Sequence, residues 1–159
     1  MKLIKFPITR KDGEILELIK NTDQKTLAVW AIDCTKRVIH FFENKYPEDH
    51  RPRYAIETLK IWINTGIFKM EVIRKASLDA HAAARETGED SPARSAARAA
   101  GQAVATAHVL RHSYGSAIYA QQAVYRAADS SDADASALKE RDWQYRHLVE
   151  LIRNNKARK

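Results

Sequence analysis

Three histidines lie in the alanine-rich middle of this 159-residue chain, and they are the side chains best suited to chemistry. His108 and His112 are four residues apart, a spacing that places two imidazoles on one face of a helix, as in many zinc sites. His81 would supply a third ligand if two neighbouring helices pack antiparallel. No His-Glu-x-x-His pattern, Cys-x-x-Cys pair or acidic cluster completes a ligand set. We therefore predict no metal and no cofactor. Three roles stay open for the imidazoles: hydrogen bonding inside the protein, contact with a partner, or binding of a small ligand.

A second polar group follows the i, i+4, i+7 spacing of one helical face: Asp33, Arg37 and His40. These residue types could serve as acid, anchor and base, but none is a nucleophile, and exposed salt-bridged stripes have the same spacing. Because Asp33 is close to Trp30, we expect its carboxylate to be half-buried and to hold an arginine or histidine from another helix. Cys34 falls on the apolar side of this helix, where a thiol behaves as a small hydrophobe. We predict no catalytic residues and no enzyme.

Composition predicts one domain over residues 1–159. With 45% hydrophobic and 30% charged residues, the chain has the make-up of a globular protein. Its longest apolar run, 27–32, is far shorter than the roughly 20 residues that a membrane span needs. The single cysteine excludes an intrachain disulfide and suits a reducing compartment. We expect a cytoplasmic protein that does not enter a membrane.

The net charge of +7 raises the question of nucleic-acid binding. Much of the excess is local, since residues 139–159 hold seven Lys or Arg against three Asp or Glu. A nucleic-acid surface would group basic residues and interleave exposed aromatic rings. Here most basic residues alternate with acids, so we expect no nucleic-acid partner. A module that binds nucleic acid through its basic C-terminal helix remains an alternative.

Apolar residues recur at the helical period along most of the chain. The start offers two choices. Thr9–Asp12 resembles a capping box that opens a short helix through Ile19, whereas a hairpin would turn at Asp12-Gly13 with residues 3–8 as an edge strand. We favour the helix, with residues 1–8 extended. Three further helices are predicted over residues 23–43, from Pro52 to a cap at Gly66, and over residues 69–86. A fourth begins at Ser91-Pro92 and runs to Leu110, and a fifth follows a break at Gly115 and runs to about residue 127. The last helix is predicted over residues 133–153, and residues 154–159 are expected to form a frayed tail.

Eighteen alanines lie between Ala76 and Ala128, so the helices of this region can approach closely. The sequence therefore predicts an all-α, single-domain bundle of about six helices with an alanine-rich core. Within it we expect Phe41 and Leu138 to face the core. Two basic residues, Arg94 and Arg98, are expected to face solvent.

Several stretches, in this order and spacing, resemble one family: the small all-helical immunity proteins of bacterial toxin–immunity systems. They span about Ala28 to Ala128. Gln102 departs from the pattern, which has histidine at that position. The stretches are 30–34 (Trp-Ala-Ile-Asp-Cys), 46–52 (Tyr-Pro-Glu-Asp-His-Arg-Pro) with Ala55-Ile56, 81–85 (His-Ala-Ala-Ala-Arg), 99–103 (Ala-Ala-Gly-Gln-Ala), and 105–109 (Ala-Thr-Ala-His-Val) with His112.

The resemblance implies a non-catalytic protein that binds and neutralises a cognate protein toxin. It also implies a polar cluster that either binds a partner or holds the helices together. The residues carried over to this cluster are Asp33, Arg51, His81, Arg85, His108 and His112. An inhibitor of a nuclease is expected to be acidic, whereas this chain is basic, so we expect an acidic or neutral toxin. A homodimer formed through an alanine-rich face, and a histidine-based metal or small-ligand protein, are the remaining alternatives.

Overall fold

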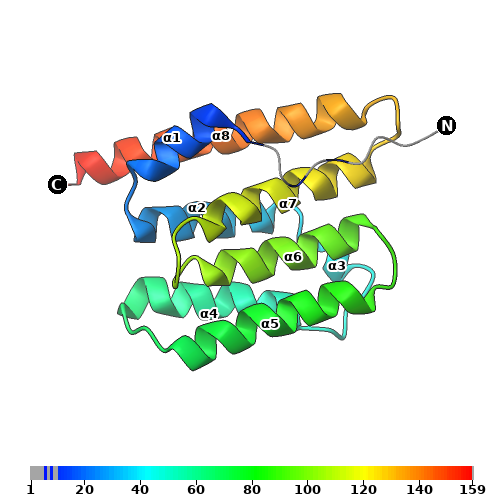
Figure 1. The fold of residues 1–159 in the computed structure, drawn as a ribbon, viewed down its shortest axis with the longest axis horizontal. Coiled ribbons are helices and arrows are strands. Elements are labelled where there is room, and N and C mark those ends of the chain that lie inside the picture. The colour runs from blue at the N-terminus through cyan, green and yellow to red at the C-terminus, as the bar shows by residue number, and fades with distance from the viewer. Residues whose placement is uncertain (1–5, 7, 9–10, 159) are drawn as a thin grey trace.

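The computed structural model of the chain describes residues 6, 8 and 11–158, and in these residues it contains eight helices and no strand (Figure 1). The prediction of an all-α protein is confirmed, and the number of helices is somewhat larger than predicted. Within the described residues, no helix combines the length and apolar character that crossing a membrane requires. The helices are α1 (Gly13–Lys20), α2 (Gln24–Lys36), α3 (His40–Glu43), α4 (Arg51–Thr65), α5 (Met70–Glu86), α6 (Pro92–Ala105), α7 (His112–Ala127) and α8 (Ala133–Ala157).

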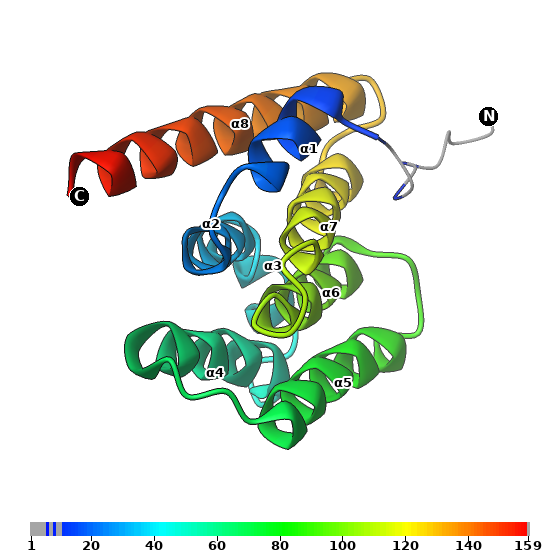
Figure 2. The same cartoon turned by 60° about the vertical axis from the view of Figure 1, so that its left-hand side comes forward.

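The helices lie in layers with α6 near the centre (Figure 2). On one outer side, α1 and α8 cover α2 and α7; on the other, α4 and α5 cover α6 and part of α2. The most extensive contacts join α6 to α7 and α5 to α6. The two outer layers are therefore connected mainly by the packing of α6 against α7.

The alanine-rich core predicted from the sequence is centred on α6. Nine residues of this helix are buried, and all of them except Val104 have small side chains. Small side chains let neighbouring backbones come close, so α6 can contact helices on several sides at once. The buried residues are Ala93, Ser95, Ala96, Ala97, Ala99, Ala100, Gly101, Ala103 and Val104.

Several predicted helix ends are confirmed by their caps. The Asp23 carboxylate accepts a hydrogen bond from the Thr26 amide, and the Ser91 hydroxyl accepts one from the Arg94 amide. At the end of α4, Gly66 adopts the left-handed conformation, with φ of 69°.

Near the N-terminus the predicted short helix is present, but it begins at Gly13 with Asp12 as its N-cap, so the predicted start in a capping box opened by Thr9 is wrong. The Asp12 side chain accepts a hydrogen bond from the amide of Ile15. A hairpin turning at Asp12-Gly13 is therefore wrong. Thr9 and most of residues 1–8 lie outside the described residues, so the extended conformation expected there remains a prediction.

The helix predicted over 23–43 is interrupted. Its first part, α2, ends at Lys36, and the amides of Val38 and Ile39 both bond to the carbonyl of Thr35 before α3 begins. This tight turn changes which face of the following residues meets the core. Phe42 is consequently buried, while Phe41, which we expected in the core, is only partly covered.

The break between α6 and α7 comes earlier than Gly115. Helix α6 ends at Ala105, and residues 106–111 form an irregular turn. The side-chain amide of Gln24, from α2, donates to the carbonyls of Thr106 and Ala107, at 2.9 Å each. A distant side chain thus satisfies carbonyls that the end of a helix leaves without a partner. Gly115 lies inside α7.

Helix α8 continues to Ala157, through four residues that we expected to be frayed. Leu138 is 51% exposed, so the prediction that it faces the core is wrong. The buried face contains Glu140 and Gln144 between small or apolar residues, so the apolar pattern alone indicated the wrong side. Its members are Ala133, Ala137, Glu140, Gln144 and Leu148.

Gln144 tests how far buried polar contacts hold α8 in place. Its amide donates to the carbonyl of Ala117 at 2.9 Å and its oxygen accepts from Gln121 at 2.8 Å. Changing Gln144 to Ala or Leu should each lower the free energy of unfolding by about 2 kcal/mol or more, because buried groups lose their partners. Urea denaturation measures this, with the exposed Glu150→Ala as control. A Gln144→Leu variant as stable as the parent would contradict the account, since leucine restores volume but not hydrogen bonds.

Candidate functional site

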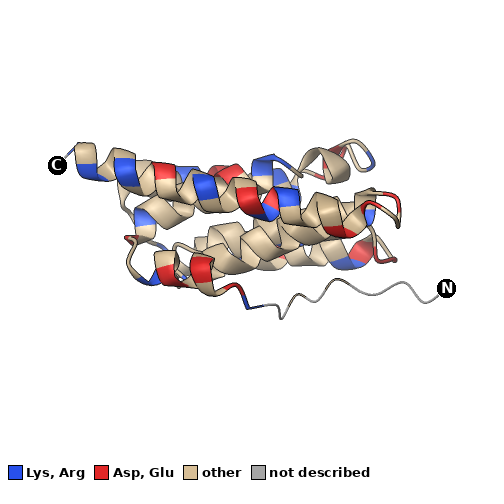
Figure 3. Cartoon of the chain, turned by 90° about the horizontal axis from the view of Figure 1, so that it is seen from above, with Lys and Arg blue, Asp and Glu red and all other residues tan. Residues whose placement is uncertain are grey.

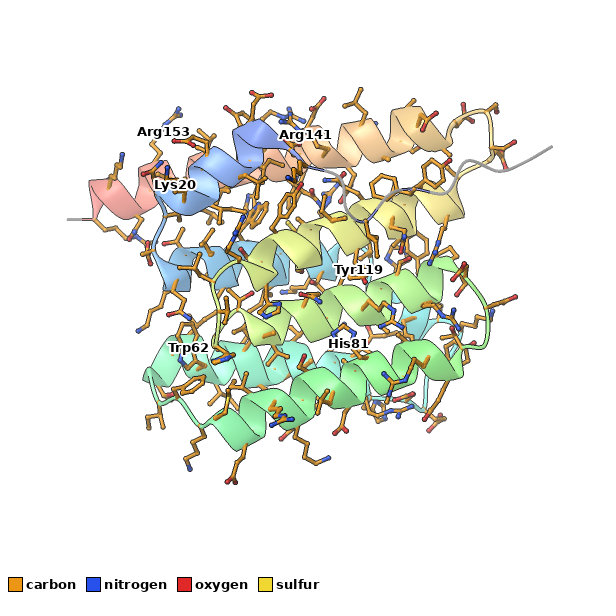
Figure 4. All side chains as sticks on the ribbon, viewed as in Figure 1. Lys20, Trp62, His81, Tyr119, Arg141 and Arg153 are labelled. Atoms are coloured by element: carbon orange, nitrogen blue, oxygen red, sulfur yellow. The ribbon has the colours of Figure 1, made fainter. Side chains whose placement is uncertain are left out.

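The six residues implied by the resemblance lie in three separate places. Asp33 is on α2, and Arg51 is the first residue of α4. The other four are along the edge formed by α5, α6 and α7, where Figure 4 shows His81 between α5 and α6. The structure therefore brings together a subset of the six rather than all of them.

Asp33 belongs to a closed network between α2 and α8. Its carboxylate lies 2.7 Å from Nε2 of His147, whose ring stacks on Trp143. The guanidinium of Arg37 lies over the Trp143 ring, 3.9 Å from its centroid, and makes two hydrogen bonds to Glu140. The expectation of a half-buried Asp33 that holds a basic side chain of another helix is confirmed. Every group has a partner within the network, so its geometry suits holding α8 against α2.

Arg51 joins the start of α4 to the end of α5. Its guanidinium pairs with Asp49 at 2.7 Å and with Glu86. These bonds raise the pKa of Arg51 and lower the pKa values of both carboxyl groups. Arg85, beside Glu86, is exposed.

His81 is held neutral between α5 and α6. Nη1 of Arg98 lies 3.2 Å from Nδ1 of His81, and a guanidinium can only donate, so Nδ1 must be the acceptor. Burial lowers the pKa of His81 to about 4, and the charges of Arg98 and Arg85 add to the effect. Arg98 thus faces α5 rather than solvent, contrary to our expectation.

Arg94 also turns toward the neighbouring helix rather than facing out as predicted. Its Nε donates to the carbonyl of Ala84, at 3.1 Å, near the end of α5. The same atom lies 3.1 Å from the Thr87 hydroxyl. Arg94 therefore satisfies carbonyl groups at the C-terminal end of α5, where cations are favoured.

Two glycines let side chains of one helix lie directly on the backbone of the next. A Cβ atom at Gly101 of α6 would come within 2.7 Å of Nε2 of His81, and one at Gly115 of α7 within 2.6 Å of Oε1 of Gln102. The oxygen of Gln102 also lies 2.8 Å from Nδ1 of His112. His81 therefore links α5 to α6, and Gln102 links α6 to α7. At each contact the opposing residue is a glycine, because a larger residue would overlap the polar side chain. Gln102, for which the resemblance led us to expect histidine, forms the second link.

His108 and His112 do not share a helical face, so that prediction is wrong. The end of α6 at Ala105 places His108 in the turn at 106–111, while His112 begins α7. The His108 ring stacks on Phe68 of the α4–α5 connector, with centroids 6.1 Å apart. Burial lowers the pKa of His112, as does the charge of His108.

Two features would support catalysis in the described part of the chain: a metal-binding set of side chains or an activated nucleophile. No set of three or more His, Cys, Asp or Glu side chains there is arranged to hold a metal ion. Cys34 is buried, and burial together with the charges of Glu140 and Asp33 raises the pKa of its thiol. The thiol is therefore protonated at neutral pH, whereas a nucleophilic cysteine needs a lowered pKa.

One surface feature escaped the sequence analysis. Seven of the ten exposed large hydrophobic side chains in the described residues lie between residues 54 and 78, on α4, α5 and their connector. An eighth, Val109, is in the turn before α7. A signal was present, because Ile67 and Phe68 are large apolar residues in a loop. We name this surface the apolar corner: Tyr54, Ile61, Ile67, Phe68, Met70, Val72, Leu78 and Val109.

Two grooves flank α5 within the apolar corner. One, of about 280 Å³, lies between α4 and α5 and is lined by Tyr54, Ile61, Ile67 and Val72 among others. The second, of about 290 Å³, lies between α5 and the 106–112 segment. The buried Ile73 lines both grooves, so they share a wall.

The described residues thus define an all-α protein with closed polar networks and one exposed apolar surface. Residues 17–151 match the family described as Imm-5 like putative immunity protein. Because the match covers 135 of the 159 residues, the chain belongs to this family. The match extends beyond the stretches that carried the resemblance, into α1 and most of α8. No curated protein and no solved structure matches the chain.

The contact of His81 with Gly101 predicts strong coupling between the two positions. Gly101→Ala should lower the free energy of unfolding by about 1–3 kcal/mol, because the new methyl group overlaps the ring. In a His81→Ala background the same change should raise it by up to about 1 kcal/mol through helix propensity. Gly13→Ala is the matched control, since its Cβ would meet open space. Equal effects of Gly101→Ala in both backgrounds would show that the contact is absent.

The neutral state of His81 predicts a loss of stability in mild acid. The folded pKa of about 4 lies below the ordinary 6.5, so the unfolded chain binds more protons as pH falls from 6.5 to 4. The stabilisation is complete above pH 6.5. Between pH 7 and 5 the free energy of unfolding should fall by about 1–2 kcal/mol, to which His112 contributes in the same direction.

Denaturation at each pH measures this loss. A His81→Gln variant should show a shallower dependence, and the exposed His40→Gln variant should keep the parental one. An unchanged slope in His81→Gln would contradict the assignment.

Proposed function

We propose that this protein is an immunity protein: a non-catalytic binder that neutralises a cognate bacterial toxin in the cytoplasm. The observation that carries the proposal is the family match over residues 17–151. The site geometry is consistent with it, because the polar side chains between the helices bond to one another. The exposed apolar corner adds support, since large exposed apolar surfaces on soluble proteins usually serve interaction.

Charge supports a toxin that is acidic or neutral. The chain carries a net charge of +7, and association is favoured between surfaces of opposite sign. An inhibitor that covers a nuclease surface would instead need to resemble phosphate. We therefore propose a target other than a nuclease.

The nucleic-acid alternative has less support. Lys and Arg alternate with Asp and Glu from Lys139 to Glu150 of α8, and the basic excess is confined to the end of the helix (Figure 3). Arg141, the most buried of the basic residues paired there, contacts Asp12 at 2.6 Å, Glu14 at 3.0 Å and Asp142 at 3.1 Å. The guanidinium of Arg141 already donates to these carboxylates, so few of its N–H groups remain to bind a phosphate.

Co-expression with the product of the neighbouring gene tests the proposal. We expect this chain to restore growth and to form a stable complex on gel filtration. In a purified assay, toxin activity should fall in proportion to added chain and reach its minimum near one equivalent, because a binder acts stoichiometrically. Affinity should weaken as salt rises from about 0.05 to about 0.5 M. Complete protection by far less than one equivalent would indicate turnover and contradict the non-catalytic role.

A further inference from the structure

We propose that the apolar corner is the surface through which the protein binds its toxin, and that it receives apolar side chains surrounded by Asp and Glu. This inference rests on the proposed function and adds the interface and its chemistry. The exposed fractions are 56% for Tyr54, 63% for Ile61, 64% for Ile67 and 55% for Leu78. Folding gives these side chains little cover, so burial against a partner would gain free energy.

The apolar corner is continuous across three parts of the chain. Tyr54 and Ile61 of α4 and Val72 of α5 line opposite walls of the first groove. On the other side of α5, Leu78 lines the second groove together with His108. The stacking of Phe68 on His108 connects the α4–α5 loop to the 106–111 turn.

The charges of the grooves favour an acidic partner. Lys69 is the charged residue lining the first groove and Arg74 the charged residue lining the second, and neither has an ion pair among the described residues. Lys25, whose Nζ is near Gly66, borders the same surface. The exposed Glu71 of α5 supplies negative charge beside these cations.

Nearby charges on α4 and α5 largely cancel. Lys60 pairs with Glu57 at 3.1 Å, and Lys75 pairs with Asp79 at 2.7 Å. What remains around the apolar corner is an excess of positive charge. A partner with carboxylates around an apolar centre would complement it.

The same charges argue against a second copy of this chain as the occupant. A two-fold symmetric interface places the same patch on both sides, so the positive charge around one apolar corner would meet the same positive charge on the other copy. The two grooves also argue against a flat lipid surface, because concave sites suit inserted side chains.

Single charge insertions into the apolar corner test the proposal. We would make Ile61→Glu and Leu78→Glu, with Leu138→Glu as the matched control, since Leu138 is a similarly exposed leucine on α8. Circular dichroism and thermal unfolding would show that each variant folds. The first two variants should weaken toxin binding by about tenfold or more and lose protection of growth. Leu138→Glu should match the parent chain.

The charge component has its own variants. Lys69→Glu and Arg74→Glu should weaken binding and reduce its dependence on salt, whereas Lys139→Glu on α8 should change neither by much. Folded Ile61→Glu and Leu78→Glu variants that still protect fully would overturn the proposal and leave the proposed function standing. Failure of the parent chain to protect would instead contradict the proposed function.

Two further measurements address other occupants. Sedimentation of the parent chain alone should show a monomer, and cosedimentation with vesicles rich in anionic lipid should leave it in solution. A dimer or vesicle complex that Leu78→Glu disrupts would assign the apolar corner to a second copy or to a membrane, and would overturn the proposal.

Discussion

The close approach of α6 to α5 and α7 is the constraint on which the rest of the structure depends. The alanines and Gly101 of α6 replace the larger side chains that normally keep helices about 8–10 Å apart. At Gly101 and Gly115 the contact is so tight that even a methyl group would overlap a neighbouring side chain. Because α6 contacts both neighbours in this way, it positions α4 and α5 on one side and α7, and with it α8, on the other.

This packing also determines what the polar residues can do. His81 lies against a backbone and beside Arg98, which keeps it neutral and removes it from acid–base chemistry near pH 7. Asp33 and Arg51 are likewise held by partners from other helices. Asp33, Arg51 and His81 thus connect helices, whereas His108 and His112 also line the second groove of the apolar corner. Within this account, fold and interface use largely different residues.

The sequence predicted the features that depend on local chemistry. The caps at Asp23, Ser91 and Gly66 follow from short-range hydrogen bonds and backbone conformation, so their residue types reveal them. The alanine-rich core and the basic partner of Asp33 were also predicted. The caps need only the residue and its near neighbours along the chain, whereas the partner of Asp33, His147, lies 114 residues away and was predicted only as a residue type.

Features that depend on distant residues were missed. The end of α6 is satisfied by Gln24, which is 82 residues away, and no local pattern marks it. On α8 the buried face includes Gln144, whose partners come from α7, so hydrophobic periodicity favoured Leu138 instead. Periodicity likewise shows that α4 and α5 have apolar faces, but not that one such face lacks a covering helix.

Hydrogen exchange of the α6 amides tests the central role of this helix most directly. If tight contact with α5 and α7 holds the bundle together, α6 amides exchange only when the whole protein unfolds, and their protection equals the global free energy of unfolding. The account predicts this result for the buried stretch 96–104. Exchange of that stretch by local opening, several kcal/mol more easily than in α2 or α8, would contradict it.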